Sequence, residues 1–331
     1  LPIVPSRFGW TSVFAEEILE LARADERIVA VTAAMQQPVG LQPMADALPD
    51  RVIDVGIAEQ HALTASAGMA FAGLHPVVAL YATFLNRAFD QVLMDVGLHH
   101  AGVTIVLDRA GLTGTDGASH NGMWDMALLA HVPGLRLAAP RDETTLREDL
   151  RTAAATSDGP TVLRYPKGAL PERAPALRVM GPPNDPFEAV DVLMEADDDG
   201  PGERRLLLVA VGAMTPAVLA AGRDLADEGR AVAVVAPRWV VPIPRALVET
   251  ARSFDGVVVV EDGLVDGGIG SQLRDALEDN AAETGRRCPV VARVGVPRRF
   301  LGTASRKQLL ADFGMDTEGI AATARRLLSA V

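Results

Sequence analysis

Apolar segments of strand length alternate with segments of helical pattern along almost all of the 331 residues. In the first half, successive positions of each strand segment are apolar, so both faces of the strand avoid water. Strands are expected at 28–32, 52–55, 76–81, 103–108, 135–139 and 161–165, with helices between them, among them 85–98, 124–130 and 144–155. Strands of this kind are typical of a mostly parallel sheet covered by helices. The sequence therefore predicts an α/β fold.

The alternation is interrupted between 168 and 205, where Pro, Asp and Gly are frequent and only 187–194 is able to form a strand. Further strands are expected at 206–211, 231–236, 257–261 and 290–294, each followed by a helical segment. We therefore predict two doubly wound, mostly parallel-sheet domains, at 11–170 and 205–331. A linker is expected at 171–204, and a second linker at 1–10, leading from an N-terminal domain that the sequence lacks.

Composition excludes several classes of function. A net charge of −12 disfavours binding to nucleic-acid phosphates and to anionic lipid surfaces, so we expect no nucleic-acid or membrane partner. No apolar run approaches the roughly 20 residues of a membrane span. The single cysteine, Cys288, cannot form an intramolecular disulfide, which is typical of a reducing compartment. We expect a cytoplasmic protein.

Glu59 lies at the junction between the strand at 52–55 and a helix in which Ala and Gly dominate. So little side-chain bulk indicates a helix packed tightly between neighbours, with Glu59 shielded from water. Because burial disfavours the charged form of a carboxyl group, an acid in this position indicates a role for its proton. The alternative is structural: a buried Glu can cap a helix or form an ion pair within the core.

A set of polar and aromatic side chains follows the carboxyl ends of three predicted strands. The set consists of Tyr81, Phe84 and Arg87 after the third strand, Arg109, Asp116 and His120 after the fourth, and Arg164 in the sixth. Ligands of open parallel sheets bind beyond these ends, so we expect the side chains to gather at one edge, where three arginines can clamp a phosphate. Taken singly, each has an alternative. Phe84 can belong to the core, Arg87 to a solvated helix face, and Asp116 and His120 can brace a glycine-rich turn.

Two weaker patterns favour structural interpretations. His99 and His100 are adjacent, so on a helix they cannot point at one ion, and we expect no metal site in this chain. The glycine cluster at 266–270 resembles a turn that binds phosphate, but we favour a tight connection between a strand and a helix.

Four longer motifs carry a resemblance to a known family. They are DVGIAEQHA at 54–62, YATFLNRAFDQ at 81–91, DRAGLTGTDG at 108–117 with His120, and LRYPKG at 163–168. In this order, they resemble the thiamine-diphosphate enzymes of the transketolase group, and within it the family that makes 1-deoxy-D-xylulose 5-phosphate. The resemblance covers nearly the whole chain. It implies a pyrimidine-binding domain followed by a transketolase C-terminal domain.

The resemblance implies a role for each matching residue. Glu59 would bind the aminopyrimidine ring of thiamine diphosphate and promote its activation, and Phe84 would stack on that ring. His120 would transfer or orient a proton during catalysis. Tyr81, Arg87, Arg109, Asp116 and Arg164 would contact the phosphorylated substrate.

The implied reaction condenses pyruvate with D-glyceraldehyde 3-phosphate, releases CO₂ and supplies isoprenoid, thiamine and pyridoxal biosynthesis. Members of the group hold the diphosphate and Mg²⁺ through a Gly-Asp-Gly motif and a later Asn in a preceding domain, and this sequence has no Gly-Asp-Gly. We therefore expect the C-terminal part of a longer enzyme, inactive without its N-terminal diphosphate-binding domain. The resemblance also implies a homodimer.

Two other interpretations remain open. The same Glu and domain order would suit the C-terminal half of a transketolase or the β subunit of a 2-oxoacid dehydrogenase. A different class is a non-catalytic binding or regulatory module that keeps the fold. The persistence of Glu59, Phe84, Arg87, His120 and Arg164 favours an enzyme.

Overall fold

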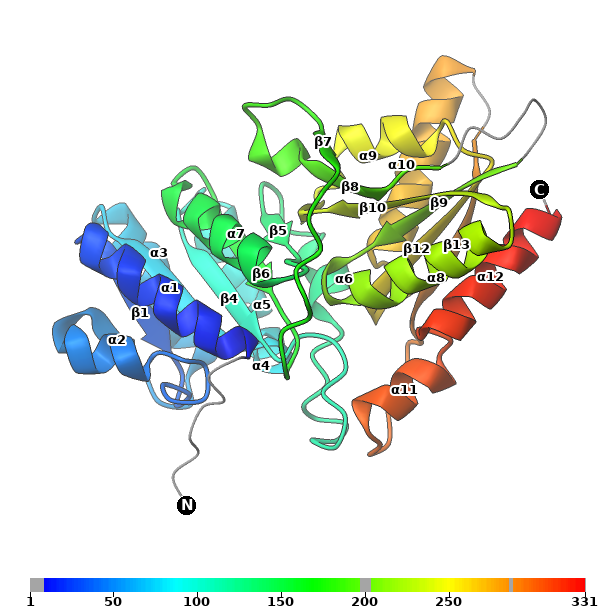
Figure 1. Ribbon diagram of the computed structural model, residues 1–331. Helices are drawn as coiled ribbons and strands as arrows, with labels where there is room; N and C mark the ends of the chain where they lie inside the picture. Colours follow the sequence, from blue (N-terminus) through cyan, green and yellow to red (C-terminus); the bar gives the residue numbers. More distant parts are fainter. Residues whose placement is uncertain (1–8, 197–203, 286–287, 331) are drawn as a thin grey trace.

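The computed structural model describes residues 9–196, 204–285 and 288–330. Most of the linker expected at 1–10, and residues 197–203 of the linker expected at 171–204, lie outside this part of the chain. Figure 1 shows two α/β units side by side. The prediction of two mostly parallel, helix-covered sheets is confirmed.

The first sheet has strand order β11-β5-β6-β4-β3-β1-β2. Its strands are β1 (Ile28–Thr32), β2 (Val52–Asp54), β3 (His75–Tyr81), β4 (Thr104–Asp108), β5 (Arg136–Ala138), β6 (Thr161–Arg164) and β11 (Trp239–Val241). All pairs are parallel except β11 with β5. Strands β1, β3, β4 and β6 are buried at every position, as expected for central strands with mostly apolar sequences. Strand β11 was not predicted, because a three-residue edge strand has no periodicity to detect.

Helices cover both faces of this sheet, with α1 and α7 in front of it and α3 behind it in Figure 1. The helices of the first unit are α1 (Trp10–Ala24), α2 (Gln42–Ala47), α3 (Glu59–Phe71), α4 (Ala82–Leu85), α5 (Phe89–Gln91), α6 (Asp125–Leu129) and α7 (Glu143–Ala155). The expected single helix at 85–98 is instead a succession of short pieces, which ends in a π-helical segment, Val92–Gly97. Phe84 and Arg87 lie where this irregular segment begins.

The second sheet has strand order β13-β12-β9-β10-β8-β7. Its strands are β7 (Arg178–Met180), β8 (Val190–Met194), β9 (Arg205–Ala210), β10 (Ala231–Pro237), β12 (Gly256–Leu264) and β13 (Val290–Val296). Its helices are α8 (Thr215–Asp227), α9 (Arg245–Ala251), α10 (Ile269–Thr284), α11 (Arg306–Asp312) and α12 (Thr317–Ala330). Both β7 and β8 come from the predicted linker at 171–204 and form an antiparallel edge.

The two units are packed against each other. A single hydrophobic cluster contains Leu80 of β3, Leu207 of β9 and Ile269 of α10. Buried charges cross the same boundary, because Asp191 of β8 accepts hydrogen bonds from Arg141, which precedes α7, and from Arg238, which follows β10. The domains are therefore held in a fixed relation by both apolar packing and ion pairs.

Helix α3 differs from its prediction. It was expected to be packed tightly between neighbours, but only one of its faces is buried, through Ala62, Leu63 and Ala67. On the opposite face, Phe71 is 62% exposed, and no other described residue comes within 4 Å of the place where a Cβ atom on Gly68 would stand. The small side chains thus leave one smooth face open.

Within the described residues, the structure contains no helix with the length and apolar character needed to cross a bilayer.

The central strands of the first sheet should dominate its stability. Leu80 is fully buried in β3, so Leu80→Ala should lower the free energy of unfolding by about 2–5 kcal/mol, since it leaves a cavity. Leu177→Ala, at a side chain that is 65% exposed, is the matched control and should change it by less than about 0.5 kcal/mol. Urea denaturation followed by circular dichroism measures both. Equal effects of the two substitutions would contradict the assigned core.

Candidate active site

Glu59 is the first residue of α3 and follows β2 by a short turn. Only 2% of Glu59 is exposed, so the expected shielding from water is confirmed. Its carboxylate also has a partner, because Arg87 Nη1 lies 3.1 Å from Oε2 and 3.4 Å from Oε1. The guanidinium of Arg87 is half exposed, whereas the carboxylate is not. The structure thus brings together a buried acid and an arginine that can be reached from solvent.

A cluster of three aromatic rings adjoins this ion pair through Phe84. Phe84 stacks on Tyr81, with ring centroids 6.0 Å apart, and His120 meets Phe84 edge-on at 5.7 Å. The Arg87 guanidinium lies 6.0 Å from the centre of the Phe84 ring. The His120 Nδ1 atom is 3.0 Å from Ser119 Oγ, so Nε2 is the ring nitrogen left for another partner. Phe84, Tyr81 and His120 therefore lie together, as predicted from their strand-end positions.

A second group of charges lies beyond Tyr81. The Arg109 guanidinium is 4.1 Å from the centre of the Tyr81 ring and donates to Asp116 Oδ2 at 3.2 Å. Lys167 Nζ binds both carboxylate oxygens of Asp116, at 2.8 and 2.9 Å. Although partial burial opposes the effect, the hydrogen bond and charge of Lys167, together with Arg109, lower the pKa of Asp116. Lys167 was not among the predicted site residues, although it follows Arg164 closely in a matched motif.

Arg164 lies apart from these groups, at the boundary between the two domains. It is 3% exposed; its Nε donates to Asp125 Oδ2 at 2.6 Å, and its Nη2 donates to the carbonyl of Asp262 at 2.7 Å. Asp125 begins α6 and Asp262 belongs to β12. Two of the three guanidinium nitrogens of Arg164, Nε and Nη2, thus already donate hydrogen bonds to other residues of the protein.

The loop that carries Arg109, Asp116 and His120 has an unusual backbone. Arg109 has φ of 58°, and the loop glycines Gly111, Gly114 and Gly117 also have positive φ values. A positive φ is uncommon for a residue other than glycine and is found where surrounding contacts impose it. Within the loop, Asn121 accepts hydrogen bonds from the amide and hydroxyl of Thr113. These hydrogen bonds hold the loop in one conformation.

The glycine-rich turn at 266–270 joins β12 to α10 and already holds a carboxyl group of the protein. The Glu261 carboxylate accepts hydrogen bonds from the amides of Ile269 and Gly270, at 2.8 and 2.9 Å. Burial raises the pKa of Glu261 to about 7, although these amides oppose the shift. The interpretation as a tight strand-to-helix connection is confirmed, since a protein carboxylate takes the place of a phosphate.

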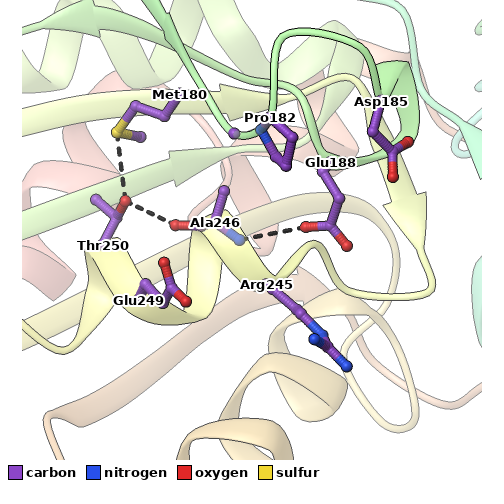
Figure 2. Close-up of a pocket in the computed structure, with 9 residues that line it drawn as sticks. Met180, Pro182, Asp185, Glu188, Arg245, Ala246, Glu249 and Thr250 are labelled. Carbon is purple, nitrogen blue, oxygen red and sulfur yellow. Dashed lines mark hydrogen bonds between the residues drawn. The ribbon is translucent and has the colours of Figure 1, made fainter.

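A groove lies elsewhere on the described surface, between the β7–β8 connection and α9 (Figure 2). Its volume is about 910 Å³, and it is lined by Met180, Gly181, Pro182, Asp185, Glu188, Arg245, Ala246, Glu249 and Thr250. Glu188 accepts a hydrogen bond from the Ala246 amide, and Thr250 donates to the Ala246 carbonyl. None of the predicted site residues lines this groove.

The described residues contain no group of three or more His, Cys, Asp and Glu side chains able to hold a metal ion. The Mg²⁺ ligands expected in a preceding domain stay a prediction.

Comparison with known families decides which proteins share this arrangement. Residues 6–173 match the family described as transketolase, pyrimidine binding domain, and residues 196–320 match the transketolase C-terminal domain. The chain belongs to the transketolase family. The first match contains Glu59, the aromatic cluster and the loop at 109–122. The second contains Asp262 and Arg306.

Curated relatives with about half of their residues identical share a name. A protein of Leifsonia xyli is 51% identical over 317 residues, which are 96% of this chain and 46% of the relative. A protein of Kitasatospora griseola is 53% identical over 333 residues, which are 99% of this chain and 49% of the relative. Both are called 1-deoxy-D-xylulose-5-phosphate synthase, the second with the number 1. The chain spans about half the length of the curated relatives it matches.

Solved structures show the same fold. A split-gene transketolase, described as an inactive β4 tetramer, superposes with a TM-score of 0.77 at 28% identity, covering 96% of this chain and 97% of the other. The transketolase of Leishmania mexicana superposes with a TM-score of 0.78 at 20% identity. The superposition covers 100% of the present chain and 47% of the Leishmania chain. The arrangement of two domains is therefore that of transketolases.

Asp108 should make stability depend on pH. It is 2% exposed at the end of β4, immediately before Arg109, and accepts a 2.6 Å hydrogen bond from Thr11 Oγ1. Burial raises the pKa of Asp108 from 3.8 to about 6. The folded state thus binds the proton more tightly than the unfolded state, and the stability present at pH 4 is lost progressively as the pH rises to about 6.

Asp108→Asn stays neutral and should not show this loss of stability. The difference in the free energy of unfolding between wild type and variant should therefore change steadily between pH 4 and about 6. Urea unfolding at pH 4, 5, 6 and 7 measures it, with Asp46→Asn at an exposed site as the control. A pH-independent difference for Asp108→Asn would contradict the assigned protonation.

Proposed function

We propose that this chain forms part of a thiamine-diphosphate-dependent enzyme that makes 1-deoxy-D-xylulose 5-phosphate and CO₂ from pyruvate and D-glyceraldehyde 3-phosphate. One observation carries the proposal: relatives that are 51% and 53% identical across at least 96% of the chain bear the name of that enzyme. The cluster around Glu59 supports it, because its side chains suit both the cofactor and a phosphorylated aldehyde. We place the enzyme in the cytoplasm, which suits a chain with one cysteine.

The residues around Glu59 fit an aminopyrimidine ring. Such a ring needs a carboxyl group at one ring nitrogen and an apolar surface for its face, and Glu59 and Phe84, both of which contact Arg87, supply these two groups. A shielded carboxyl is suited to share a proton with the ring, because water does not compete for it. Thiamine diphosphate, when bound, supplies the electron sink for decarboxylation. Glu59 and Phe84 would hold and orient its pyrimidine.

The ion pair between Glu59 and Arg87 has a consequence for binding. A ring nitrogen that approaches Glu59 has to share the carboxylate with Arg87 or displace it. Since the Arg87 side chain is 49% exposed, it can turn toward a substrate phosphate without crossing the core. The pair would thus hold Glu59 in place before the cofactor arrives and release the arginine afterwards.

The phosphate of glyceraldehyde 3-phosphate needs several cationic donors. Arg87 and Arg109 lie on the two sides of the Tyr81–Phe84 stack, and Lys167 adds a third positive charge through Asp116. Asp116 would keep Arg109 and Lys167 oriented, while Tyr81 and Arg109 contact the substrate. For Arg164 to contact it, the guanidinium has to use its remaining Nη1 donors, because Nε and Nη2 are occupied. His120 would move a proton through Nε2.

The proposal also requires a second polypeptide or domain. The chain spans about half of its curated relatives, and the ligands for diphosphate and Mg²⁺ are proposed to lie in the other half. The split-gene transketolase offers a parallel, since its matching chain has nearly the same extent and its tetramer is described as inactive. We therefore infer that this chain acts together with a diphosphate-binding domain.

Glu59→Gln tests the proton role. The amide keeps the size of the side chain but cannot give up a proton in the same way, so turnover should fall by about 100-fold or more. The assay combines the chain with its diphosphate-binding domain, pyruvate and glyceraldehyde 3-phosphate, and measures CO₂ and deoxyxylulose phosphate. Glu20→Gln, on α1, is the control and should leave the rate unchanged. Full activity of Glu59→Gln would show that the proton is not needed.

The choice of donor separates the related activities. With pyruvate as donor, we expect CO₂ and the five-carbon product. A transketolase would instead form product from a ketose phosphate donor without releasing CO₂, and such a result would overturn the proposed substrate pair while leaving the fold unaffected.

A homodimer is proposed through the open face of α3. Large apolar side chains gather there, with Ile57, Phe71, Met94 and Leu98 between 46% and 79% exposed. Exposed apolar groups of this kind mark interaction surfaces, and small side chains let a second backbone come close.

Sedimentation equilibrium should give a multiple of the 34.9 kDa chain mass, and Phe71→Glu should shift it toward the single chain, because a charge would be buried at the interface. The matched control is Phe300→Glu, at a ring that is 80% exposed in the C-terminal domain. A monomeric wild type would contradict the dimer.

A further inference from the structure

Leu112, in the loop that carries the proposed substrate contacts, is held by two residues of the C-terminal domain. The Leu112 amide donates to Asp262 Oδ1 at 3.0 Å, and Arg306 Nη1 donates to the Leu112 carbonyl at 2.6 Å. Arg306 Nη2 also pairs with Asp262 Oδ2. The backbone amide and carbonyl of one buried residue are therefore both bound by a single ion pair from another domain.

The glycines of the loop fit closely against the same two residues. A Cβ atom on Gly111 would lie 2.2 Å from the Asp262 carboxyl group, and one on Gly114 would lie 2.7 Å from the Arg306 amide. Both glycines have positive φ, at 72° and 79°. The loop can approach Asp262 and Arg306 this closely only because it lacks side chains at these two positions.

This contact lies at the base of the loop, between the site residues. Arg109 precedes Gly111 by two residues, and Asp116 and His120 follow Leu112 by four and eight. The Gly111 amide donates to the Gly122 carbonyl at 2.9 Å, which joins the start of the loop to its end. A displacement of Leu112 is therefore transmitted to both sides of the loop.

Asp262 also reaches a second part of the site, because its carbonyl accepts the hydrogen bond from Arg164 Nη2. Neither the carboxylate of Asp262 nor the head of Arg306 adjoins Glu59 or Phe84 in any contact recorded among the described residues. The Asp262 carboxylate and the Arg306 head contact the loop backbone and each other, and the Asp262 carbonyl contacts Arg164. The pair is thus suited to orient the substrate side of the site and not its cofactor side.

We propose that Asp262 and Arg306 are positioning residues: their ion pair holds the loop at 109–122 in the shape that presents Arg109, Asp116 and His120 to the phosphorylated acceptor. The effect on substrate binding rests on the proposed function, whereas the effect on the loop does not. In this proposal, the C-terminal domain contributes to binding of the acceptor by holding the loop.

Hydrogen–deuterium exchange of this chain, read by mass spectrometry, tests the loop directly. Arg306→Met removes both guanidinium contacts and keeps only the apolar stem of the side chain, so amides of 109–122 should exchange about tenfold faster or more, while β4 and β12 keep their protection. Arg274→Met, which removes an exposed, ion-paired arginine from α10, is the matched control and should leave the loop unchanged. Unchanged exchange in Arg306→Met would overturn the proposal.

Two milder variants decide the question if Arg306→Met loses protection throughout the chain. Asp262→Asn keeps an oxygen for the Leu112 amide but removes the charge that Arg306 pairs with, and Arg306→Lys keeps one charge without the second donor group. Each should raise exchange in 109–122 alone, by less than Arg306→Met. Wild-type exchange in both variants would overturn the proposal.

Kinetics of the chain combined with its diphosphate-binding domain test the consequence for the substrate. Arg306→Met should raise the KM for glyceraldehyde 3-phosphate by about tenfold and leave that for pyruvate unchanged, since misplacing binding groups by small distances weakens only the ligand they contact. A lower kcat with both KM values unchanged would indicate a merely structural role and overturn the assignment to acceptor binding. If wild type makes no product from pyruvate, the proposed function fails, and the exchange experiment still decides the role in the loop.

Discussion

A charge that is buried in a protein has to be paired, and in this chain that requirement determines how the site is built. Glu59 is paired with Arg87, Arg164 with Asp125, and Asp262 with Arg306. In each pair at least one side chain is almost completely buried. Asp262 and Arg306 come from the second domain, and Asp262 also binds Arg164 and Leu112 of the first. The same interactions therefore join the two domains and organise the site.

The arrangement separates two tasks. Glu59 and Phe84 lie where α3 and α4 begin, on elements fixed by the sheet, and suit a planar ring that has to be held in one orientation. Arg109, Asp116 and His120 lie on a loop whose backbone is strained at Arg109 and held by the C-terminal domain. In the proposed enzyme, the first group would hold the cofactor and the loop would hold the substrate.

The sequence was sufficient to predict the sheets, because central parallel strands such as β3 and β4 are apolar at nearly every position. It also predicted the burial of Glu59 and the gathering of Phe84, Tyr81 and His120, since strand ends share one edge. It could not predict which charges pair. Arg87 meets Glu59 across 28 residues, and Arg306 meets the Leu112 carbonyl across 194, and no local pattern encodes such contacts. The open face of α3 was misjudged, because small residues indicate close packing without saying whether the neighbour belongs to the same chain.

The central claim is that the shielded carboxyl group of Glu59 is the place where an aminopyrimidine binds. A crystal structure of this chain in complex with its diphosphate-binding domain and thiamine diphosphate tests this most directly. The account predicts a ring nitrogen about 3 Å from a Glu59 carboxylate oxygen, the Phe84 ring stacked on the pyrimidine, and Arg87 turned away from Glu59 or sharing its carboxylate. A cofactor bound with its pyrimidine elsewhere, while Glu59 remains paired with Arg87 alone, would contradict it.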